Sequence, residues 1–179
     1  MAERLLVDRT QLATIVERIA WSLMERYYPF RNTLLIGLQP RGVLFAQRLM
    51  ERLRAIAPDF PPAFGALDAT LFRDDISKHQ GIKVPYETHI PEPIQDSQVI
   101  LVDDVLFTGR SVRAGLDALF NLGRPASVRL VVLVDRKHNR QVPICPDITG
   151  IEVEAMAQER VKVLWSPPEE REGIWLIGE

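Results

Sequence analysis

The pattern of apolar and polar positions along the chain predicts helices and strands in alternation. Residues 10–27 repeat apolar side chains every three or four positions, which predicts an amphipathic helix, and 41–56 follow the same spacing. Between them, 34–37 form a short apolar run that ends in glycine and predicts a buried strand. A third helix is expected over 111–122, because a glycine and a proline follow it closely.

Further strands are expected in short segments rich in branched apolar residues. The run 99–102 is unbroken and typical of a central parallel strand. The other expected strands are 67–72, which follows a proline-containing linker over 60–64, then 128–134, 161–165 and 174–177. Because strands and helices alternate, we expect an α/β fold, with a parallel sheet flanked by helices on both faces.

Length and composition fit one globular domain spanning 1–179. The chain has 179 residues, of which 46% are hydrophobic and 26% charged. Within it, residues 73–96 carry prolines, a glycine and many polar side chains with little periodicity. A loop of this length inside a compact domain is usually functional or mobile. We therefore expect a mobile loop over about 73–90.

Charge and cysteine content exclude several classes of protein. A net charge of −2 and a pI near 6.0 give no global basic field for nucleic acid, although a local basic face stays open. The single cysteine, Cys145, excludes an intramolecular disulfide framework and suits a reducing cytosol. No apolar run approaches the ~20 residues that span a bilayer, and the first residues lack an export pattern. We expect a cytoplasmic protein that does not enter membranes.

The most informative stretch is 99–111, Val-Ile-Leu-Val-Asp-Asp-Val-Leu-Phe-Thr-Gly-Arg-Ser. Asp103 and Asp104 are expected at the carboxyl end of a buried strand, where open α/β sheets bind ligands. Adjacent buried carboxylates repel each other unless a cation or hydrogen-bond donors lie close, and a sugar diol with a divalent metal would satisfy both. Residues 108–111 lead into a helix, whose N–H groups and hydroxyls form an anion site. The combination indicates a sugar phosphate.

Other interpretations of the acidic pair fit less well. The magnesium-binding strand of P-loop nucleotidases requires a glycine-rich loop ending in Gly-Lys-Ser/Thr, which this sequence lacks. The acidic pair of bacterial receiver domains lies near the chain start, whereas Asp103 lies past the middle. A purely structural role, in which Asp104 caps a turn, leaves the Thr-Gly-Arg-Ser sequence unexplained.

Residues 99–111 resemble the phosphoribosyl pyrophosphate signature of type I phosphoribosyltransferases. The wider chain resembles the PyrR family, which comprises pyrimidine-operon attenuation regulators that are also uracil phosphoribosyltransferases. The matching segments occur in the family's order over roughly residues 5–150; they are 37–43, 67–75, 103–114, 123–125 and 132–138. The resemblance therefore implies a type I phosphoribosyltransferase fold.

The resemblance also implies an activity, a cofactor and catalytic residues. Uracil and phosphoribosyl pyrophosphate would give UMP and pyrophosphate, with Mg²⁺ required. Asp103 and Asp104 would hold the ribose hydroxyls. Arg73 would reach the pyrophosphate, while Asp74 or Asp75 would orient it or hold a bridging magnesium ion. No dedicated metal cage is expected, because magnesium is held mainly by substrate phosphates, with Asp103 and Asp104 as candidate protein ligands.

Three segments would bind the substrates. A pyrophosphate loop is formed by Gln39, Pro40, Arg41 and Gly42. The sugar phosphate would lie against Val105, Leu106, Phe107, Thr108, Gly109, Arg110 and Ser111. Uracil would lie near Asp135, Arg136, Lys137 and His138. Pro40 replaces the family's usual threonine, which removes one hydroxyl and one N–H and favours a cis peptide. In the loop, Lys78, His79 and Lys83 are interpreted as solvated.

The resemblance further implies binding of pyrimidine-gene leader mRNA through a basic face. This chain carries Cys145 and acidic side chains over 150–154 where the family has basic and amide groups, and acids repel phosphate. Trp21 stands where the family often carries histidine. The candidate basic patch comprises Arg18, Arg26, Arg31 and Arg140.

Three functions stay open at this point. The first is a uracil phosphoribosyltransferase, with or without control of transcription through RNA, and the intact sugar site and loop acids favour it. The second is a phosphoribosyltransferase for another base. The third is a nucleotide-sensing RNA-binding regulator with little turnover, for which Pro40 is the motivating feature. The resemblance implies a homo-oligomer, a dimer or a higher assembly.

Overall fold

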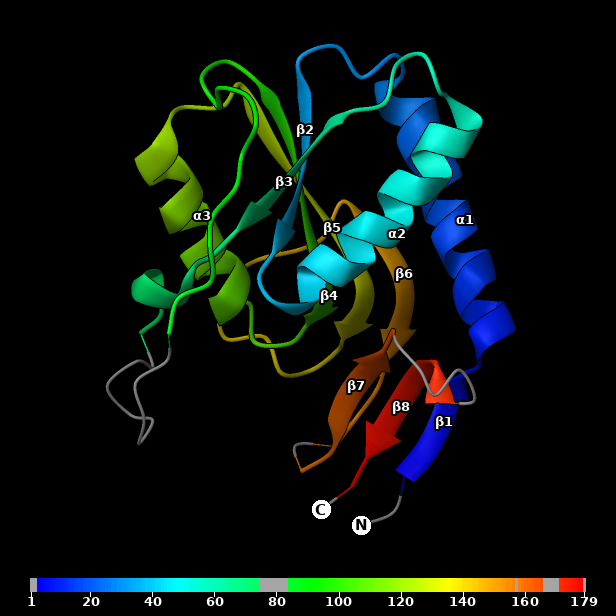
Figure 1. Cartoon of the computed structure of the whole chain (residues 1–179). Coiled ribbons are helices and arrows are strands. Elements are labelled where there is room, and N and C mark those ends of the chain that lie inside the picture. The colour runs from blue at the N-terminus through cyan, green and yellow to red at the C-terminus, as the bar shows by residue number, and fades with distance from the viewer. Residues whose placement is uncertain (1–2, 75–83, 157, 166–170, 179) are drawn as a thin grey trace.

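The centre of the molecule is a five-stranded parallel sheet in the order β3-β2-β4-β5-β6 (Figure 1). The structure is a computed structural model that describes residues 3–74, 84–156, 158–165 and 171–178. The strands of this sheet are β2 (Thr33–Leu38), β3 (Ala63–Leu67), β4 (Gln98–Leu106), β5 (Ser127–Arg136) and β6 (Ile148–Val153).

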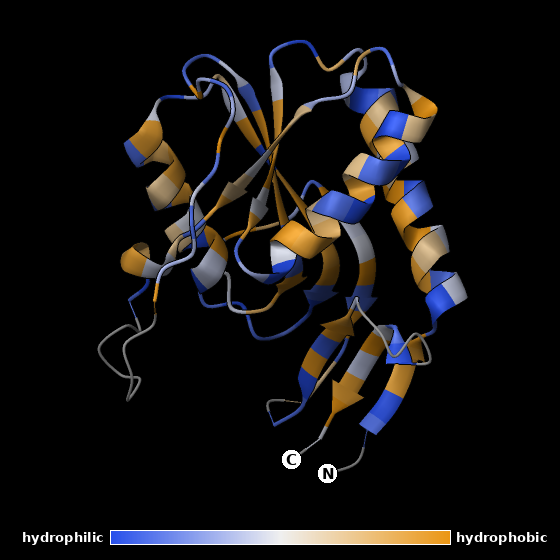
Figure 2. Cartoon of the chain, viewed as in Figure 1, coloured by the Kyte–Doolittle hydropathy of each residue, from blue (hydrophilic) through white to orange (hydrophobic). Residues whose placement is uncertain are grey.

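Helices cover both faces of the sheet, as predicted. Helices α1 (Arg9–Tyr27) and α2 (Arg41–Ile56) lie on one face and α3 (Arg110–Leu122) lies on the other (Figure 1). Apolar and polar residues alternate along each helix in Figure 2, because one side of each helix packs on the sheet and the other meets solvent.

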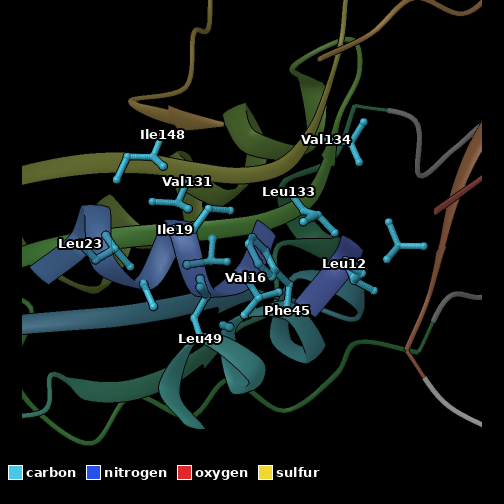
Figure 3. Packing of buried hydrophobic residues seen from close by; sticks show 14 of the residues in the cluster. Leu12, Val16, Ile19, Leu23, Phe45, Leu49, Val131, Leu133, Val134 and Ile148 are labelled. Carbon is cyan, nitrogen blue, oxygen red and sulfur yellow. The ribbon is translucent and has the colours of Figure 1, made fainter. Parts of the chain in front are cut away.

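Two apolar cores follow from this layering. The larger core lies between the sheet and helices α1 and α2. Figure 3 shows its centre, which includes Ile19, Leu23, Phe45, Leu49 and Val131. A smaller core packs α3 against the opposite face of the sheet. The central strands β2 and β4 are buried on both faces, which is why each contains an unbroken run of apolar residues.

A second, antiparallel sheet lies beyond the carboxyl ends of the parallel strands (Figure 1). It has three strands in the order β1-β8-β7: β1 (Glu3–Val7), β8 (Gly173–Ile177) and β7 (Arg160–Leu164). Trp165 stacks on Phe45 of α2 with ring centroids 5.7 Å apart, which ties this small sheet to the main core. Sequence analysis missed β1 and the separate sheet, because β1 pairs with a strand from the opposite end of the chain.

The predicted strand over 67–72 was wrong. Strand β3 ends at Leu67, and Thr70–Phe72 form a short 3₁₀ helix, η1. The Oδ1 atom of Asp68 accepts hydrogen bonds from the N–H and the hydroxyl of Thr70, at 3.0 and 2.6 Å, so the chain turns where a strand was expected. Strand β3 instead begins inside the segment expected to be a linker, and β6 was not predicted.

The helix boundaries agree closely with the predictions. Helix α1 begins one residue earlier than expected, at a capping box in which Gln11 N–H donates to Asp8 Oδ1 (2.8 Å) and Asp8 N–H donates to Gln11 Oε1 (3.1 Å). None of the helices in the described part of the chain has both the length and the apolar character needed to cross a membrane.

Candidate active site

The acidic pair lies where β4 extends past its neighbour β2. The last pair between these strands is Gly37 with Val102, whereas β4 remains paired with β5 as far as Leu106. Asp103 and Asp104 therefore have β5 on one side and the start of α2 on the other. Gly42 makes this approach possible, since a Cβ atom there would lie 2.5 Å from the Val102 carbonyl oxygen.

Burial gives the two carboxyl groups unusual electrostatics. Asp103 and Asp104 are 9% and 5% exposed. Burial, with repulsion from Asp104 as the second cause, raises the pKa of Asp103 well above its ordinary value. Burial also raises the pKa of Asp104, although the positive charge of Arg41 opposes that rise. A cation or a set of hydrogen-bond donors would stabilise both carboxylates here.

One oxygen of the pair has no hydrogen-bond partner in the described part of the chain. Asp104 N–H donates to Asp103 Oδ1 at 2.9 Å, and Val105 N–H donates to Asp104 Oδ1 at 2.8 Å. Asp104 Oδ2 is buried and accepts no hydrogen bond from the described residues. Because a buried acceptor without a donor costs free energy, this oxygen is suited to receive a donor or cation from a ligand.

A cavity of about 300 Å³ extends from Asp103 to the start of α3. Gly109 begins the helix with a left-handed backbone (φ 86°), and Thr108 Oγ1 accepts a hydrogen bond from Arg110 N–H at 3.3 Å. Free N–H groups at a helix start, with the helix dipole behind them, attract anions. The cavity is lined by Arg73, Asp103, Val105, Leu106, Phe107, Thr108, Gly109, Arg110, Ser111 and Val112.

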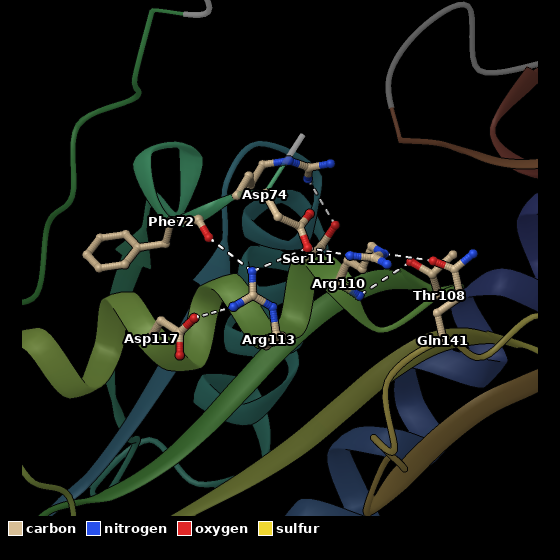
Figure 4. Close-up of polar contacts among 9 residues, drawn as sticks. Phe72, Asp74, Thr108, Arg110, Ser111, Arg113, Asp117 and Gln141 are labelled. Carbon is tan, nitrogen blue, oxygen red and sulfur yellow. Dashed lines mark hydrogen bonds and ion pairs between the residues drawn. The ribbon is translucent and has the colours of Figure 1, made fainter. Parts of the chain in front are cut away.

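The first two residues of the predicted mobile loop contact residues at the start of α3 (Figure 4). Arg73 donates from Nη1 to Ser111 Oγ at 3.0 Å. Asp74 forms an ion pair with Arg110, and its Oδ2 lies 3.6 Å from Nη2 of Arg113. The structure thus brings Arg73 and Asp74 to the predicted phosphate residues. The other loop residues singled out from the sequence lie outside the described residues; they are Asp75, Lys78, His79 and Lys83.

The predicted pyrophosphate loop lies at the start of α2. The Gln39–Pro40 peptide is cis, as the sequence favours, and Gln39 N–H donates to the Leu67 carbonyl at 2.9 Å. Pro40 precedes the first helical residue and gives the helix no side-chain cap. Arg41 is exposed and lies close enough for its charge to lower the pKa of Asp104. The predicted pyrophosphate loop and the acidic pair are therefore neighbours.

The 135–138 segment at the end of β5 is tied to its surroundings. Arg136 is buried and places its guanidinium 4.0 Å from the centroid of the Phe107 ring. Its Nη2 donates to the Met156 carbonyl at 3.1 Å, while its Nε has no partner among the described residues. Burial lowers the pKa of Arg136. Arg136 therefore contacts Phe107, which lines the cavity, and is not itself a lining residue.

The remaining predicted base-site residues are spread over a wider surface. Asp135 is buried and pairs with Arg140 and, at 3.4 Å, with Lys137. Lys137 also pairs with an acidic residue of β6 at 2.8 Å. His138 is exposed, with its Nε2 3.7 Å from Glu154 Oε1. Among the described residues, the cavity lining does not include 135–138.

The candidate basic patch is only partly assembled. Arg18 and Arg26, both on α1, donate to the carbonyls of Gly150 and Asp147 in the same region. Arg140 instead pairs with Asp135, which neutralises its charge. The sequence pattern marked Arg140 only as a basic residue and did not indicate that 140–142 contact residues 107–111, which we call the phosphate loop. No motif marks them.

The comparisons with known proteins agree with this geometry. Residues 6–166 match the family described as the phosphoribosyl transferase domain. The fold matches a hypoxanthine-guanine phosphoribosyltransferase from Bacillus anthracis (TM-score 0.71, 15% identity, 100% of both chains). It also matches the Trypanosoma cruzi hypoxanthine phosphoribosyltransferase in complex with IMP (TM-score 0.66, 19% identity, 83% of this chain and 79% of that one). The molecule is a type I phosphoribosyltransferase in fold, as predicted.

Curated relatives define the family more narrowly. Bifunctional protein PyrR of Bacillus subtilis (strain 168) is 43% identical over 88% of this chain and 87% of its own. Bifunctional protein PyrR of Synechococcus sp. (strain JA-2-3B'a(2-13)) is 40% identical over 99% of this chain and 96% of its own. The chain belongs to the PyrR family, which confirms the resemblance found in the sequence.

Proposed function

We propose that this PyrR-family protein transfers the phosphoribosyl group of phosphoribosyl pyrophosphate to uracil, forming UMP and pyrophosphate. One observation carries the proposal: a buried acidic residue and the anion-binding start of α3 line the same cavity of about 300 Å³. A ligand that fills it needs hydrogen-bond donors at one end and an anion at the other. A ribose 5-phosphate group has both.

The acidic pair binds the ribose. The 2′- and 3′-hydroxyls of the ribose donate hydrogen bonds to Asp103 and Asp104. Asp104 Oδ2 supports this role because it is buried and has no donor among the described residues. Hydrogen bonds from these hydroxyls stabilise the carboxylate oxygens, so the carboxyl groups need not be protonated. They also stabilise the charged form of Asp103, whose pKa is raised by burial first and by repulsion from Asp104 second.

The start of α3 binds the 5′-phosphate. The N–H groups that follow Thr108 and the hydroxyls of Thr108 and Ser111 donate to the phosphate oxygens, and the helix dipole favours the negative charge. Gly109 adopts the left-handed backbone (φ 86°) at the start of this helix, a conformation that glycine takes without strain. Arg73, which donates to Ser111 here, turns toward the pyrophosphate when the phosphate takes that hydroxyl.

Substitution at the ribose C1′ atom needs little covalent help from the protein. The C1′–O bond to pyrophosphate breaks and its electron pair leaves with the pyrophosphate. The N1 atom of uracil forms the new bond to C1′ and releases its proton. Arg41 and Arg73 stabilise the charge that builds on the leaving group. The 135–138 segment, at the end of β5, supplies the uracil end of the site.

Magnesium fits this site as a substrate-held ion. The described residues contain no cluster of three or more His, Cys, Asp or Glu side chains suited to a metal. Asp104 Oδ2 and Asp103 can each supply a carboxylate oxygen, and the substrate phosphates and water supply the rest. When bound, Mg²⁺ neutralises charge on the departing pyrophosphate.

Initial-rate assays test the proposal directly. Formation of the nucleoside monophosphate and release of pyrophosphate are measured with phosphoribosyl pyrophosphate, Mg²⁺ and uracil, and then with cytosine, orotate and hypoxanthine in place of uracil. Turnover with uracil that is lost in Asp103→Asn supports the proposal. Turnover confined to another base supports the alternative of a different phosphoribosyltransferase. Absence of turnover with every base, together with specific RNA binding, would overturn the enzyme in favour of a regulator.

A second role follows from the family, UMP-dependent binding of pyrimidine-gene leader mRNA by a homo-oligomer. Arg18 and Arg26 favour it, because both are exposed on α1. Within the described residues, their side chains donate to the carbonyl oxygens of Gly150 and Asp147, which leaves each guanidinium its charge. Titrations of leader RNA at several salt concentrations test it, with Arg18→Gln/Arg26→Gln for comparison. A salt slope and an affinity that are the same in the variant would contradict a role for these arginines.

A further inference from the structure

Arg140 connects two segments that the proposed function assigns to opposite ends of the substrate. Its Nη1 donates to the carbonyl oxygen of Phe107, and its Nη2 pairs with the carboxylate of Asp135. The side chain of Arg140 is 23% exposed and that of Asp135 is 5% exposed, so solvent screens this ion pair only weakly. A single guanidinium thus joins the phosphate loop to the end of β5.

The neighbours of Arg140 hold the same loop from the same side. The N–H groups of Gln141 and Val142 both donate to the Thr108 carbonyl, at 2.9 and 3.1 Å. Gln141 Oε1 accepts from Arg110 Nε at 2.7 Å (Figure 4). We call residues 140–142 the brace.

The brace also fills the space beside Gly109. A Cβ atom on Gly109 would lie 3.4 Å from Val142 Cβ and 3.5 Å from Arg140 Cδ. The phosphate loop therefore has packed protein on one side and the cavity, which Thr108 and Gly109 line, on the other.

The direction of the loop N–H groups follows from these contacts. In a planar trans peptide the N–H points opposite to the C=O. The brace binds the carbonyls of Phe107 and Thr108, so the N–H groups of Thr108 and Gly109, which belong to those same peptides, point away from the brace. Hydrogen bonds formed outside the cavity thereby fix the direction of the N–H groups that can donate to a phosphate inside it.

We propose that Arg140 is a positioning residue, which fixes the phosphate-binding peptides relative to the base end of the site. This inference rests on the proposed function and deepens it, because a nucleotide must contact both ends at once. Arg140 acts through Phe107 and Asp135 and does not itself touch the substrate.

The test compares Arg140→Ala and Arg140→Lys with Arg129→Ala. The control removes the exposed ion pair between Arg129, near the start of β5, and Asp147. Measurements are kcat, KM for phosphoribosyl pyrophosphate, the Kd values of UMP and ribose 5-phosphate, and Tm.

We expect Arg140→Ala to raise the KM and both Kd values about tenfold, since small misplacements of binding groups are costly. Lysine keeps a charge for Asp135 but cannot hold both partners, so Arg140→Lys should keep Tm near wild type with an intermediate rise in KM.

The outcomes separate this inference from the proposed function. If Arg140→Lys and Arg140→Ala lower Tm or kcat while KM and Kd stay as in Arg129→Ala, Arg140 is merely structural and the inference is overturned. If the wild-type protein shows no turnover with any base, the proposed function fails. Ribose 5-phosphate binding then still decides whether Arg140 positions the phosphate loop.

Discussion

Arg73 Nη1 lies 3.0 Å from Ser111 Oγ and donates a hydrogen bond to it, so the first residue of the predicted mobile loop contacts a hydroxyl of the proposed phosphate site. The next residue, Asp74, pairs with Arg110 at the start of α3. The protein's own carboxylate therefore lies where an anion is expected to bind. A substrate phosphate must compete with these contacts.

The first prediction follows from that competition. Asp74→Ala removes the carboxylate that pairs with Arg110 and should lower the Kd for ribose 5-phosphate. The pair is about half exposed, so the gain is small, about twofold to threefold. Isothermal titration calorimetry at low salt measures it. Asp117→Ala is the matched control, because it removes the 2.7 Å pair with Arg113 and leaves Asp74 in place. Equal affinities in the two variants would refute the competition.

Asp103→Asn should separate activity from stability. Asparagine keeps an Oδ1 atom that can accept from Asp104 N–H, so the local hydrogen bond survives. It removes the negative charge that serves the ribose and the Mg²⁺-bearing substrate. We expect kcat/KM to fall at least about a hundredfold while Tm stays the same or rises, because repulsion between the acids is lost. Activity assays and thermal unfolding measure the two effects, and a large fall in Tm would count against this role.

The raised pKa values of the acidic pair predict a pH-dependent stability. The native state of Asp103 and Asp104 keeps protons that the unfolded chain loses above about pH 4. The free energy of unfolding should therefore decrease as the pH rises from about 4 through the raised pKa values. Urea unfolding between pH 4 and 8 tests this. Asp103→Asn should show a shallower decrease, whereas Asp59→Asn, at an exposed position, should follow the wild type.

Gly42→Ala tests the close approach of α2 to β4. The added Cβ atom would lie 2.5 Å from the Val102 carbonyl oxygen and 3.0 Å from Asp103 Cα, so the backbone must shift. We expect a loss of about 1–3 kcal/mol in the free energy of unfolding and a loss of activity from the displaced acidic pair. Urea denaturation and initial rates measure both. Gly123→Ala is the control, because a Cβ atom there meets its neighbours at 3.4 Å or more. Wild-type stability in Gly42→Ala would show that α2 can move away from β4 at little cost.

The amphipathic helices and the buried central strands could be predicted because their signals are local. Helix α2 matches its expected range, and 99–102 lies inside β4. The strand extends to Leu106 because β5 continues beside it after β2 has ended, a pairing that no local pattern reveals. The segment 67–72 failed for the opposite reason, because the side chain of Asp68 forms a turn within an apolar sequence.

In the candidate site too, some features could be predicted from local sequence and others depend on distant segments. The order Asp-Asp followed by Thr-Gly-Arg-Ser already indicates a diol site and an anion site, since each residue type carries its chemistry with it. The sequence could not show that Asp104 Oδ2 lacks a donor among the residues the structure describes, or that Arg136 lies over the Phe107 ring. Burial and orientation depend on elements distant in the chain.

The sequence by itself determined the periodicity of the helices, the apolar central strands, the phosphoribosyl pyrophosphate signature and the family. Tertiary structure alone decided that β1 pairs with β8, that Arg73 contacts Ser111, and that Arg140 holds the phosphate loop against Asp135. The physical reason is the separation along the chain of the residues that interact. Propensity and amphipathicity act between residues a few positions apart, whereas strand pairing, desolvation of charge and side-chain hydrogen bonds depend on which segments meet when the chain folds.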